Sequence, residues 1–146
     1  MGSAKAVEKM VVKVPREKFF EVITEYEKLP SFIPELDNVK VTTTSGNMNM
    51  VTYSISLLGR AISYTLQLTN YPSDRVAWKL VKGDFMKKNE GRWLLEEIDE
   101  NTTGVTYELE MAFPMIVPSA IVAQLQKNSL PKLMDQYKTR AEALYG

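Results

Sequence analysis

The strongest constraint on the fold is a change in the spacing of apolar residues along the chain. From residue 39 to residue 113, over about seventy residues, apolar and polar side chains alternate with a period of two, which indicates strands with one buried face. From Ser119 onward the apolar residues recur with a helical period. A series of strands followed by one long helix predicts an α+β fold in which the helix covers the apolar face of the sheet.

Turn-forming residues divide the alternating region into six predicted strands. Breaks fall near Gly46, Gly59, Pro72, Gly83 and Gly104. Because the connections are short, consecutive strands are expected to pair side by side in an antiparallel meander. The predicted strands are residues 39–44, 49–57, 61–69, 75–82, roughly 87–98 and 105–113.

A further strand and two helical segments are predicted before this sheet. Residues 7–14 alternate as a strand, and Pro15 suits the first position of a helix. An apolar helical face follows, made by Phe19, Phe20, Ile23 and Tyr26. We expect this helix to end at residues 29–30, and residues 31–34 to add one short helical turn.

The C-terminal helix is predicted to be about 25 residues long, or roughly 38 Å. Its apolar stripe consists of Ile121, Leu125, Leu130, Leu133, Tyr137, Ala141 and Leu144. Pro131 lies inside it, so we expect a kink near Asn128 or Ser129. The predicted order is β-α-α-β6-α, with a curved antiparallel sheet of six to seven strands wrapped round the long helix. At 146 residues the chain fits a single domain, residues 1–146.

The composition narrows the possible functions. The chain contains no cysteine and no histidine, which excludes disulfides, thiolate zinc sites, cysteine nucleophiles and imidazole-based triads. We therefore expect no metal and no cofactor. Its 18 basic and 18 acidic residues give a net charge of zero, so we expect no nucleic-acid partner.

The termini and apolar runs predict a cytoplasmic protein. Residues 1–10 contain no apolar run typical of a signal peptide. The longest apolar stretch, residues 112–123, is broken by Pro114, Pro118 and Ser119 and is far shorter than the ~20 residues of a membrane span.

The alternation also identifies the sheet face that points at the helix. Its residues, together with those of the helix stripe, form either a solid core or the wall of a cavity, and the pattern alone leaves both open. Three inward tyrosines favour a cavity, because buried hydroxyls need partners and ligand sites combine apolar walls with a few polar groups. The predicted cavity residues are Val51, Tyr53, Ile55, Ile62, Tyr64, Leu66, Trp78, Leu80, Trp93, Leu95, Tyr107, Leu109, Met111, Phe113, Ile121, Leu125 and Leu133.

The segment 113–118 is apolar where a connecting loop is usually polar. Three interpretations stay open: it tucks under the helix, it forms part of a flexible cavity mouth, or it touches a membrane transiently during ligand exchange. The predicted rim residues are Phe32, Phe85, Met115 and Ile116.

Acidic residues offer little for catalysis. Glu108 and Glu110 share the outward face of a strand, which indicates solvated surface. Glu97 is in phase with Trp93 and Leu95 and is the single weak candidate for a catalytic acid or base. A strand end that faces solvent explains its position equally well.

Several segments carry a family resemblance when taken together: residues 11–20 (VVKVPREKFF), 26–34 (YEKLPSFIP), 81–93 (VKGDFMKKNEGRW), 103–110 (TGVTYELE) and 137–142 (YKTRAE). They resemble the START-like (SRPBCC) superfamily, especially its bacterial polyketide cyclase/dehydrase and coenzyme Q-binding-protein-like branch. The resemblance implies a helix-grip fold around a cavity. The functions it implies range from carriage of lipids and quinones to cyclisation of polyketides, with no catalytic residue to transfer.

These sequence features and the family resemblance leave three possible functions. The first is non-enzymatic binding or carriage of a hydrophobic small molecule, namely a lipid, an isoprenoid or quinone, or an aromatic polyketide. The second is a cyclase or dehydratase that uses tyrosine hydroxyls and Glu97. The third is a protein-interaction module at a membrane or ribosome, since members resembling ribosome-associating toxins share the same segments; the protein partner is unknown.

Overall fold

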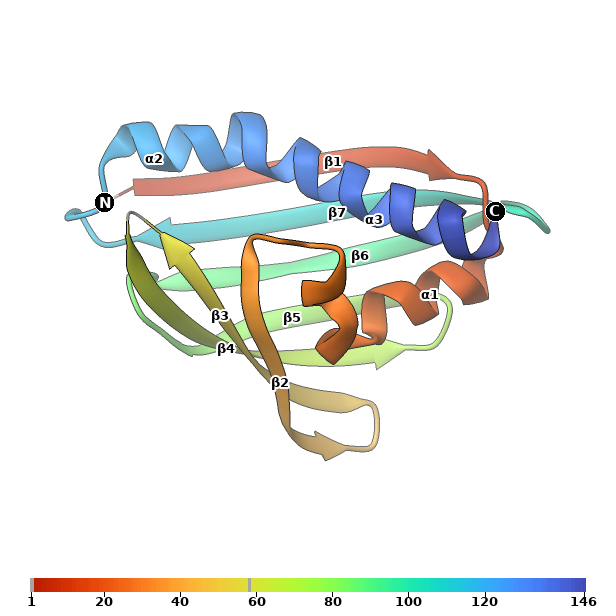
Figure 1. The fold of residues 1–146 in the computed structure, drawn as a ribbon, viewed down its shortest axis with the longest axis horizontal. Helices are drawn as coiled ribbons and strands as arrows, with labels where there is room; N and C mark the ends of the chain where they lie inside the picture. The colour runs from red at the N-terminus through yellow and green to blue at the C-terminus, as the bar shows by residue number, and fades with distance from the viewer. Residues whose placement is uncertain (1, 58) are drawn as a thin grey trace.

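The computed structural model describes residues 2–57 and 59–146, apart from the side chains of Leu57, Leu125 and Gln126. Seven strands, three α-helices, one 3₁₀ helix and one π-helix follow one another in the described part of the chain (Figure 1). Their order is β1 (Gly2–Val12), α1 (Arg16–Thr24), η1 (Tyr26–Ser31), β2 (Leu36–Ser45), β3 (Met48–Leu57), β4 (Arg60–Tyr71), β5 (Arg75–Gly83), β6 (Lys88–Asp99), β7 (Thr102–Phe113), α2 (Ser119–Gln124), η2 (Leu125–Ser129) and α3 (Leu130–Tyr145).

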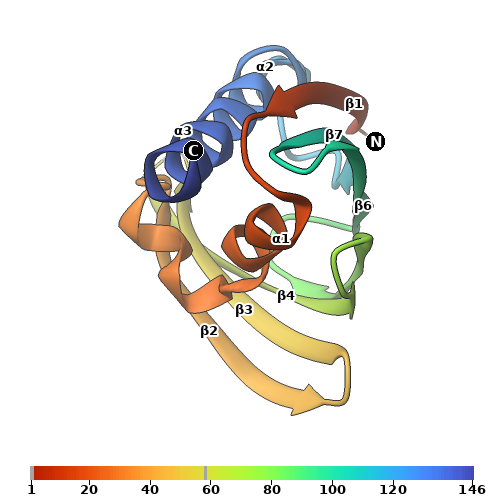
Figure 2. The ribbon, with the colours of Figure 1, turned by 90° about the vertical axis from the view of Figure 1, so that its right-hand side faces the viewer.

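All seven strands form one antiparallel sheet in the order β1-β7-β6-β5-β4-β3-β2. The sheet is strongly curved, with α3 lying across its concave side and α1 at one end of that side (Figures 1 and 2). Irregular register in the β2–β3, β4–β5 and β6–β7 pairs contributes to the curvature, because bulges increase local bend and twist. The predicted α+β fold, a curved antiparallel sheet holding a long C-terminal helix, is confirmed.

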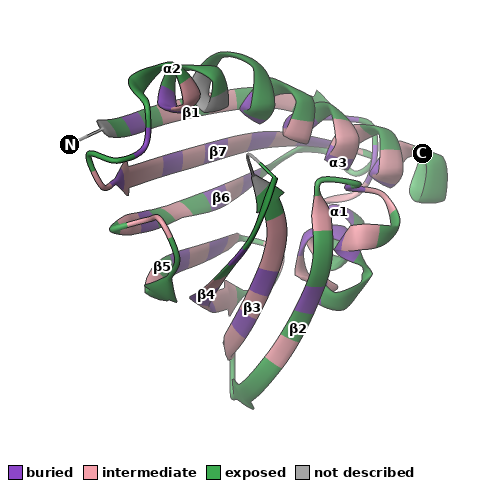
Figure 3. Cartoon of the chain, turned by 60° about the vertical axis from the view of Figure 1, so that its left-hand side comes forward, coloured by how far each residue is buried: buried purple, intermediate pink, exposed green. Residues whose placement is uncertain are grey.

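The two faces of the sheet differ as the alternation requires. Buried and half-exposed residues alternate along β7 (Figure 3). On the outer face Glu110 lies 2.9 Å from Lys88 and 3.6 Å from Lys5, and Arg92 is paired with Glu108. These cross-strand ion pairs keep the outer face solvated, while the inner face supplies the core.

The first helix ends earlier than predicted. It begins at Arg16, directly after Pro15, and stops at Thr24 rather than at residues 29–30. The chain then continues as the 3₁₀ helix η1, which contains Pro30. Proline has no N–H, and its ring would clash with the carbonyl four residues back in an α-helix. The change of helix type upstream of Pro30 avoids that clash.

The C-terminal helix changes type at the predicted kink. The π-helix η2 spans Leu125–Ser129, directly before Leu130 and Pro131. A π-turn takes in one more residue than an α-turn. Val122 and Met134, both buried, would lie about 120° apart on a continuous α-helix, but the extra residue reduces this angle to about 20°. The π-turn therefore keeps both halves of the helix facing the sheet.

An aromatic cluster joins the helices to the sheet. The indole of Trp93, on β6, has edge contacts with Phe19 of α1 at 5.8 Å between ring centroids, with Tyr107 of β7 at 4.7 Å and with Tyr137 of α3 at 4.9 Å. Such edge-to-face pairs add to the stabilisation from apolar burial.

No helix in the described part of the chain is long and apolar enough to cross a bilayer.

Replacement of Thr103 by valine is expected to destabilise the fold. Thr103 is fully buried, and its hydroxyl donates to the carbonyl of Val14 at 2.8 Å, which joins β7 to the connection between β1 and α1. In Thr103→Val this buried carbonyl loses its partner, so the free energy of unfolding should fall by about 1–3 kcal/mol. Urea denaturation measures the change. Thr43→Val, at an exposed position of β2, is the control and should change stability by no more than about 0.5 kcal/mol.

Candidate functional site

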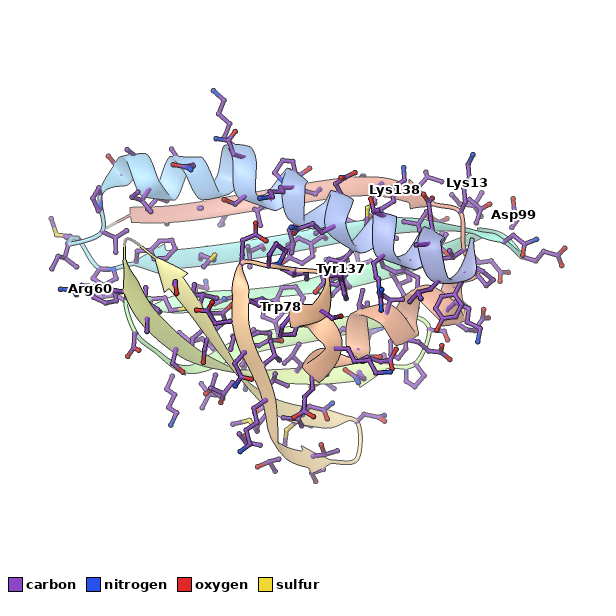
Figure 4. All side chains as sticks on the ribbon, viewed as in Figure 1. Lys13, Arg60, Trp78, Asp99, Tyr137 and Lys138 are labelled. Carbon is purple, nitrogen blue, oxygen red and sulfur yellow. The ribbon has the colours of Figure 1, made fainter. Side chains whose placement is uncertain are left out.

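A cavity of about 520 Å³ lies between the concave face of the sheet and the helices. Its walls come from β3 to β7 on one side, from α1 and η1 at one end, and from the C-terminal helix on the other side. Tyr137 of α3 and Trp78 of β5 both point into the region between helix and sheet (Figure 4). The volume falls within the roughly 300–1,000 Å³ range of small-molecule sites.

Many of the residues predicted from the alternation line this cavity. They come from five strands and from α3, and they bring three tyrosines and both tryptophans of the chain to one space. They are Tyr53, Ile55, Tyr64, Leu66, Trp78, Trp93, Tyr107, Leu109, Met111 and Leu133.

Other predicted cavity residues lie elsewhere. Val51 and Leu95 are buried in the main core, and Leu80 packs against it. Phe113 belongs to a smaller cluster with Ala4, Val117 and Val122, against which Ile121 packs. Ile62 is buried but does not line the cavity, and the side chain of Leu125 lies outside the described residues. The alternation identified the inward face, but it could not show which inward residues line the cavity and which pack in the core around it.

The four predicted rim residues do not line the cavity either. Phe32 packs edge-on against Tyr137, with ring centroids 5.6 Å apart. Phe85 packs on the smaller cluster, beneath the guanidinium of Arg60. In the connection to α2, Val117 is buried while Met115 and Ile116 are 84% and 74% exposed. The connection is thus anchored by Val117 and presents its other apolar side chains to solvent.

The mouth of the cavity is polar. Gln124, Asn128, Ser129 and Lys132 line it from the C-terminal helix, and all four are exposed. Opposite them stands Glu35, directly before β2. Its Oε2 lies 2.7 Å from the Nζ of Lys132. Hydrogen bonds from Lys132 first and from Gln136 second hold the pKa of the Glu35 carboxyl below its ordinary value.

Deeper in the cavity, one polar pair is buried. The Nε1 of Trp78 donates to the Oδ1 of Asn89 at 3.0 Å. Gly91, opposite Trp78 on β6, makes this possible: a Cβ at position 91 would stand 2.9 Å from the indole. The bare backbone of Gly91 lets the indole lie close to the sheet, where it forms part of the cavity wall.

Four tyrosines, Tyr53, Tyr64, Tyr107 and Tyr137, supply further polar groups to the cavity. The rings of Tyr53 and Tyr64 are stacked at 5.1 Å. In the part of the chain that the structure describes, none of the four hydroxyls has a protein hydrogen-bond partner. Tyr26, by contrast, donates to the Oδ1 of Asn70 at 2.6 Å. The four hydroxyls are therefore available to a bound molecule.

Burial determines how these tyrosines can act. Desolvation raises the pKa of Tyr64 to about 12 and also raises the pKa values of Tyr53, Tyr107 and Tyr137 above the ordinary 10. All four hydroxyls stay protonated at neutral pH. They can donate hydrogen bonds to carbonyl or hydroxyl oxygens of a ligand, and they are poor proton donors for catalysis.

The position of Glu97 corrects the catalytic interpretation. Glu97 is exposed near the end of β6, beside a register shift between Glu97 and Asp99, and it does not line the cavity. Glu35 is the one carboxylate among the described lining residues. Across the described residues, no group of three or more acidic side chains is placed to hold a metal ion.

Sequence reasoning missed several lining residues, among them Leu68, Val76 and Tyr137, which share the inward face of predicted residues. Asn89 is in phase with Gly91 and Trp93, so the alternation could have found it. The apolar face of the first helical segments was recognised but not assigned to the cavity; it contributes Ile23, Tyr26, Leu29 and Ile33. The polar residues at the mouth carried no signal, because polar residues on a helix usually indicate solvent.

These features define the fold as START-like, with an internal cavity between a curved sheet and a C-terminal helix. A family model described as polyketide cyclase / dehydrase and lipid transport matches residues 12–138. The chain belongs to this family. Among curated proteins, no sequence is significantly similar to this chain.

Solved structures share the fold at low sequence identity. A START superfamily protein from Mycobacterium smegmatis is 18% identical, with a TM-score of 0.83 over 96% of this chain and 98% of that one. The Zhui aromatase/cyclase from a Streptomyces species is 13% identical, with a TM-score of 0.83 over 96% and 94%. A protein from Thermus thermophilus is 16% identical, with a TM-score of 0.85 over 98% and 100%.

The raised tyrosine pKa values predict a loss of stability at alkaline pH. In the unfolded chain tyrosine ionises near pH 10, whereas Tyr64 in the folded protein ionises at about 12. The folded-state pKa is the higher one, so its contribution to stability is complete below about pH 10 and is lost as the pH rises toward 12. Urea denaturation across this range should give a shallower decline for Tyr64→Phe than for the unchanged protein. Parallel declines would contradict the assignment.

Proposed function

We propose that the chain binds a hydrophobic small molecule in this cavity and carries it without chemical change. The ligand classes are those considered from the sequence: a lipid, an isoprenoid or quinone, or an aromatic polyketide. The observation that carries the proposal is the cavity of about 520 Å³ with apolar walls and four tyrosine hydroxyls that have no protein hydrogen-bond partner among the described residues. Apolar walls provide affinity, and a few hydrogen-bond donors orient the ligand.

The energetics are sufficient for such binding. Burial of ten methylene groups is worth roughly 8 kcal/mol before the costs of association. A micromolar dissociation constant corresponds to about 8 kcal/mol. Apolar contact therefore supplies a gross free energy of the size needed, and hydrogen bonds from the tyrosines have to offset the costs of association.

The side chains of the cavity favour binding over catalysis. The tyrosines are protonated donors, and Glu35 lies at the mouth as an ionised partner of Lys132. General acid–base catalysis requires a group whose pKa lies near the working pH and which faces the reacting atoms. A cyclase or dehydratase activity, suggested by the family description and by the name of the Streptomyces aromatase/cyclase, is the alternative. It would rest on orientation of a polyketide by the tyrosines.

Mass spectrometry of an organic extract of the purified protein tests the proposal directly. A matched extract from host cells that lack the protein serves as the blank. We expect a hydrophobic compound in an amount approaching one molecule per chain. If the extract is empty, candidate lipids, quinones and aromatic polyketides are added to the protein and binding is measured by calorimetry. Absence of binding in all three classes would contradict the proposal.

Leu109→Arg is expected to abolish binding. Leu109 is buried, lines the cavity and lies two residues after Tyr107 on the inward face of β7. A guanidinium at this position would fill part of the cavity and place a charge among apolar walls. Val11→Arg, at a position of β1 that is 50% exposed, is the matched control and should bind as the unchanged protein does. Circular dichroism checks that both variants fold; a folded Leu109→Arg protein with unchanged affinity would contradict this location of the site.

A further inference from the structure

The mouth of the cavity contains a single pair of opposite charges. Glu35 and Lys132 are the two charged residues among the described lining side chains, and they bind each other at 2.7 Å. The second carboxylate oxygen of Glu35 accepts a hydrogen bond from the Nε2 of Gln136 at 3.0 Å. Both oxygens of Glu35 are thus occupied. The ammonium of Lys132 has three donors, of which the ion pair with Glu35 uses one.

This pair connects the two sides of the mouth. Glu35 precedes β2, while Lys132 and Gln136 lie one turn apart on α3. The side chains of Lys132 and Glu35 are 63% and 49% exposed. Ion pairs at such exposure contribute little to stability because water and salt compete with them. The pair can therefore open easily and exchange one partner for another.

The surroundings of the pair change from polar to apolar toward the interior. Gln124 and Asn128 line the mouth beside Lys132, while Leu36 and Leu133, each next in sequence to a member of the pair, also line the cavity. A ligand whose apolar part fills the cavity would present its remaining end to this pair. That end would meet the ammonium and amide donors together.

We propose that Lys132 binds the anionic head group of an amphipathic ligand, and that this head group, a carboxylate, takes the place of Glu35 on the ammonium. The inference rests on the proposed function. Lys132 is the better partner for a ligand, because its flexible apolar stem can follow the cavity wall while its ammonium stays at the polar mouth. Glu35 is held by two donors, Lys132 and Gln136, and so is less suited to bind a cationic head.

Three probes with the same ten-carbon chain and different heads test this inference. They are decanoate, 1-decanol and decylamine, and their binding is followed by the fluorescence of Trp78 and Trp93, both of which line the cavity. Decanoate should bind best and decylamine worst. Raising the salt concentration should weaken decanoate binding and leave decanol binding nearly unchanged, because salt screens the charged contact.

Two variants separate the roles of the pair. Lys132→Met keeps the apolar stem and removes the charge, so the dissociation constant of decanoate should rise roughly three- to tenfold while that of decanol stays the same. Glu35→Gln removes the competing carboxylate, so decanoate should bind roughly two- to fivefold more tightly. Lys138→Met is the matched control, since Lys138 lies on the same helix (Figure 4) but does not line the cavity; it should change neither probe.

The outcomes distinguish this inference from the proposed function. Binding of decanol with equal effects of Lys132→Met on both probes, or with no effect, would overturn the inference and leave the cavity function standing. Tighter binding of decylamine than of decanoate would also overturn it. Failure of all three probes to bind the unchanged protein would overturn the inference and count against the proposed function as well.

Discussion

The packing around Trp93 is the contact on which the rest of the structure depends. One indole on β6 touches an aromatic ring from α1, another from β7 and a third from α3. Because aromatic rings are rigid and large, these contacts fix the separation between the helices and the sheet at this point. Away from Trp93, large side chains such as Tyr53, Tyr64 and Trp78 line the space between the helices and the sheet without filling it, and this unfilled space is the cavity.

Several local features keep that space open rather than letting it collapse. The described register pairs β5 with β6 only from Arg75 to Trp78, so no described ladder joins the two strands beyond Trp78. Gly91 allows the indole of Trp78 to lie close to the backbone. The hydrogen bond to Asn89 then holds this ring in place. A solid core would require larger inward side chains on β6 than Asn89 and Gly91.

The sequence predicted which face of each strand and helix points inward much better than it predicted which residues of that face line the cavity. The alternation in β7 identified Tyr107 and Leu109 correctly as inward, but it could not distinguish them from Phe113, which is inward as well and packs in a separate cluster. Which inward residues of a strand line the cavity depends on where the helix crosses the strand. The crossing point is determined by the whole fold. The ion pair of Glu35 and Lys132 could not be predicted from the sequence for the same reason, since it joins residues far apart in the chain. By contrast, an irregularity in the helix before Pro131 was predictable, because proline acts on its own helix.

The π-turn in the C-terminal helix has a consequence for how this chain can vary in length. In the sequence it corresponds to the five-residue step from Leu125 to Leu130, where an α-helical stripe would take three or four. Loss of one residue between 125 and 129 would remove the extra residue that the π-turn takes in and leave the faces of both halves unchanged. Loss of one residue within 132–136 would instead rotate everything beyond it by about 100°. A single-residue deletion in the C-terminal helix is thus tolerable at this segment, where an engineered version of the chain can be shortened without repacking the core.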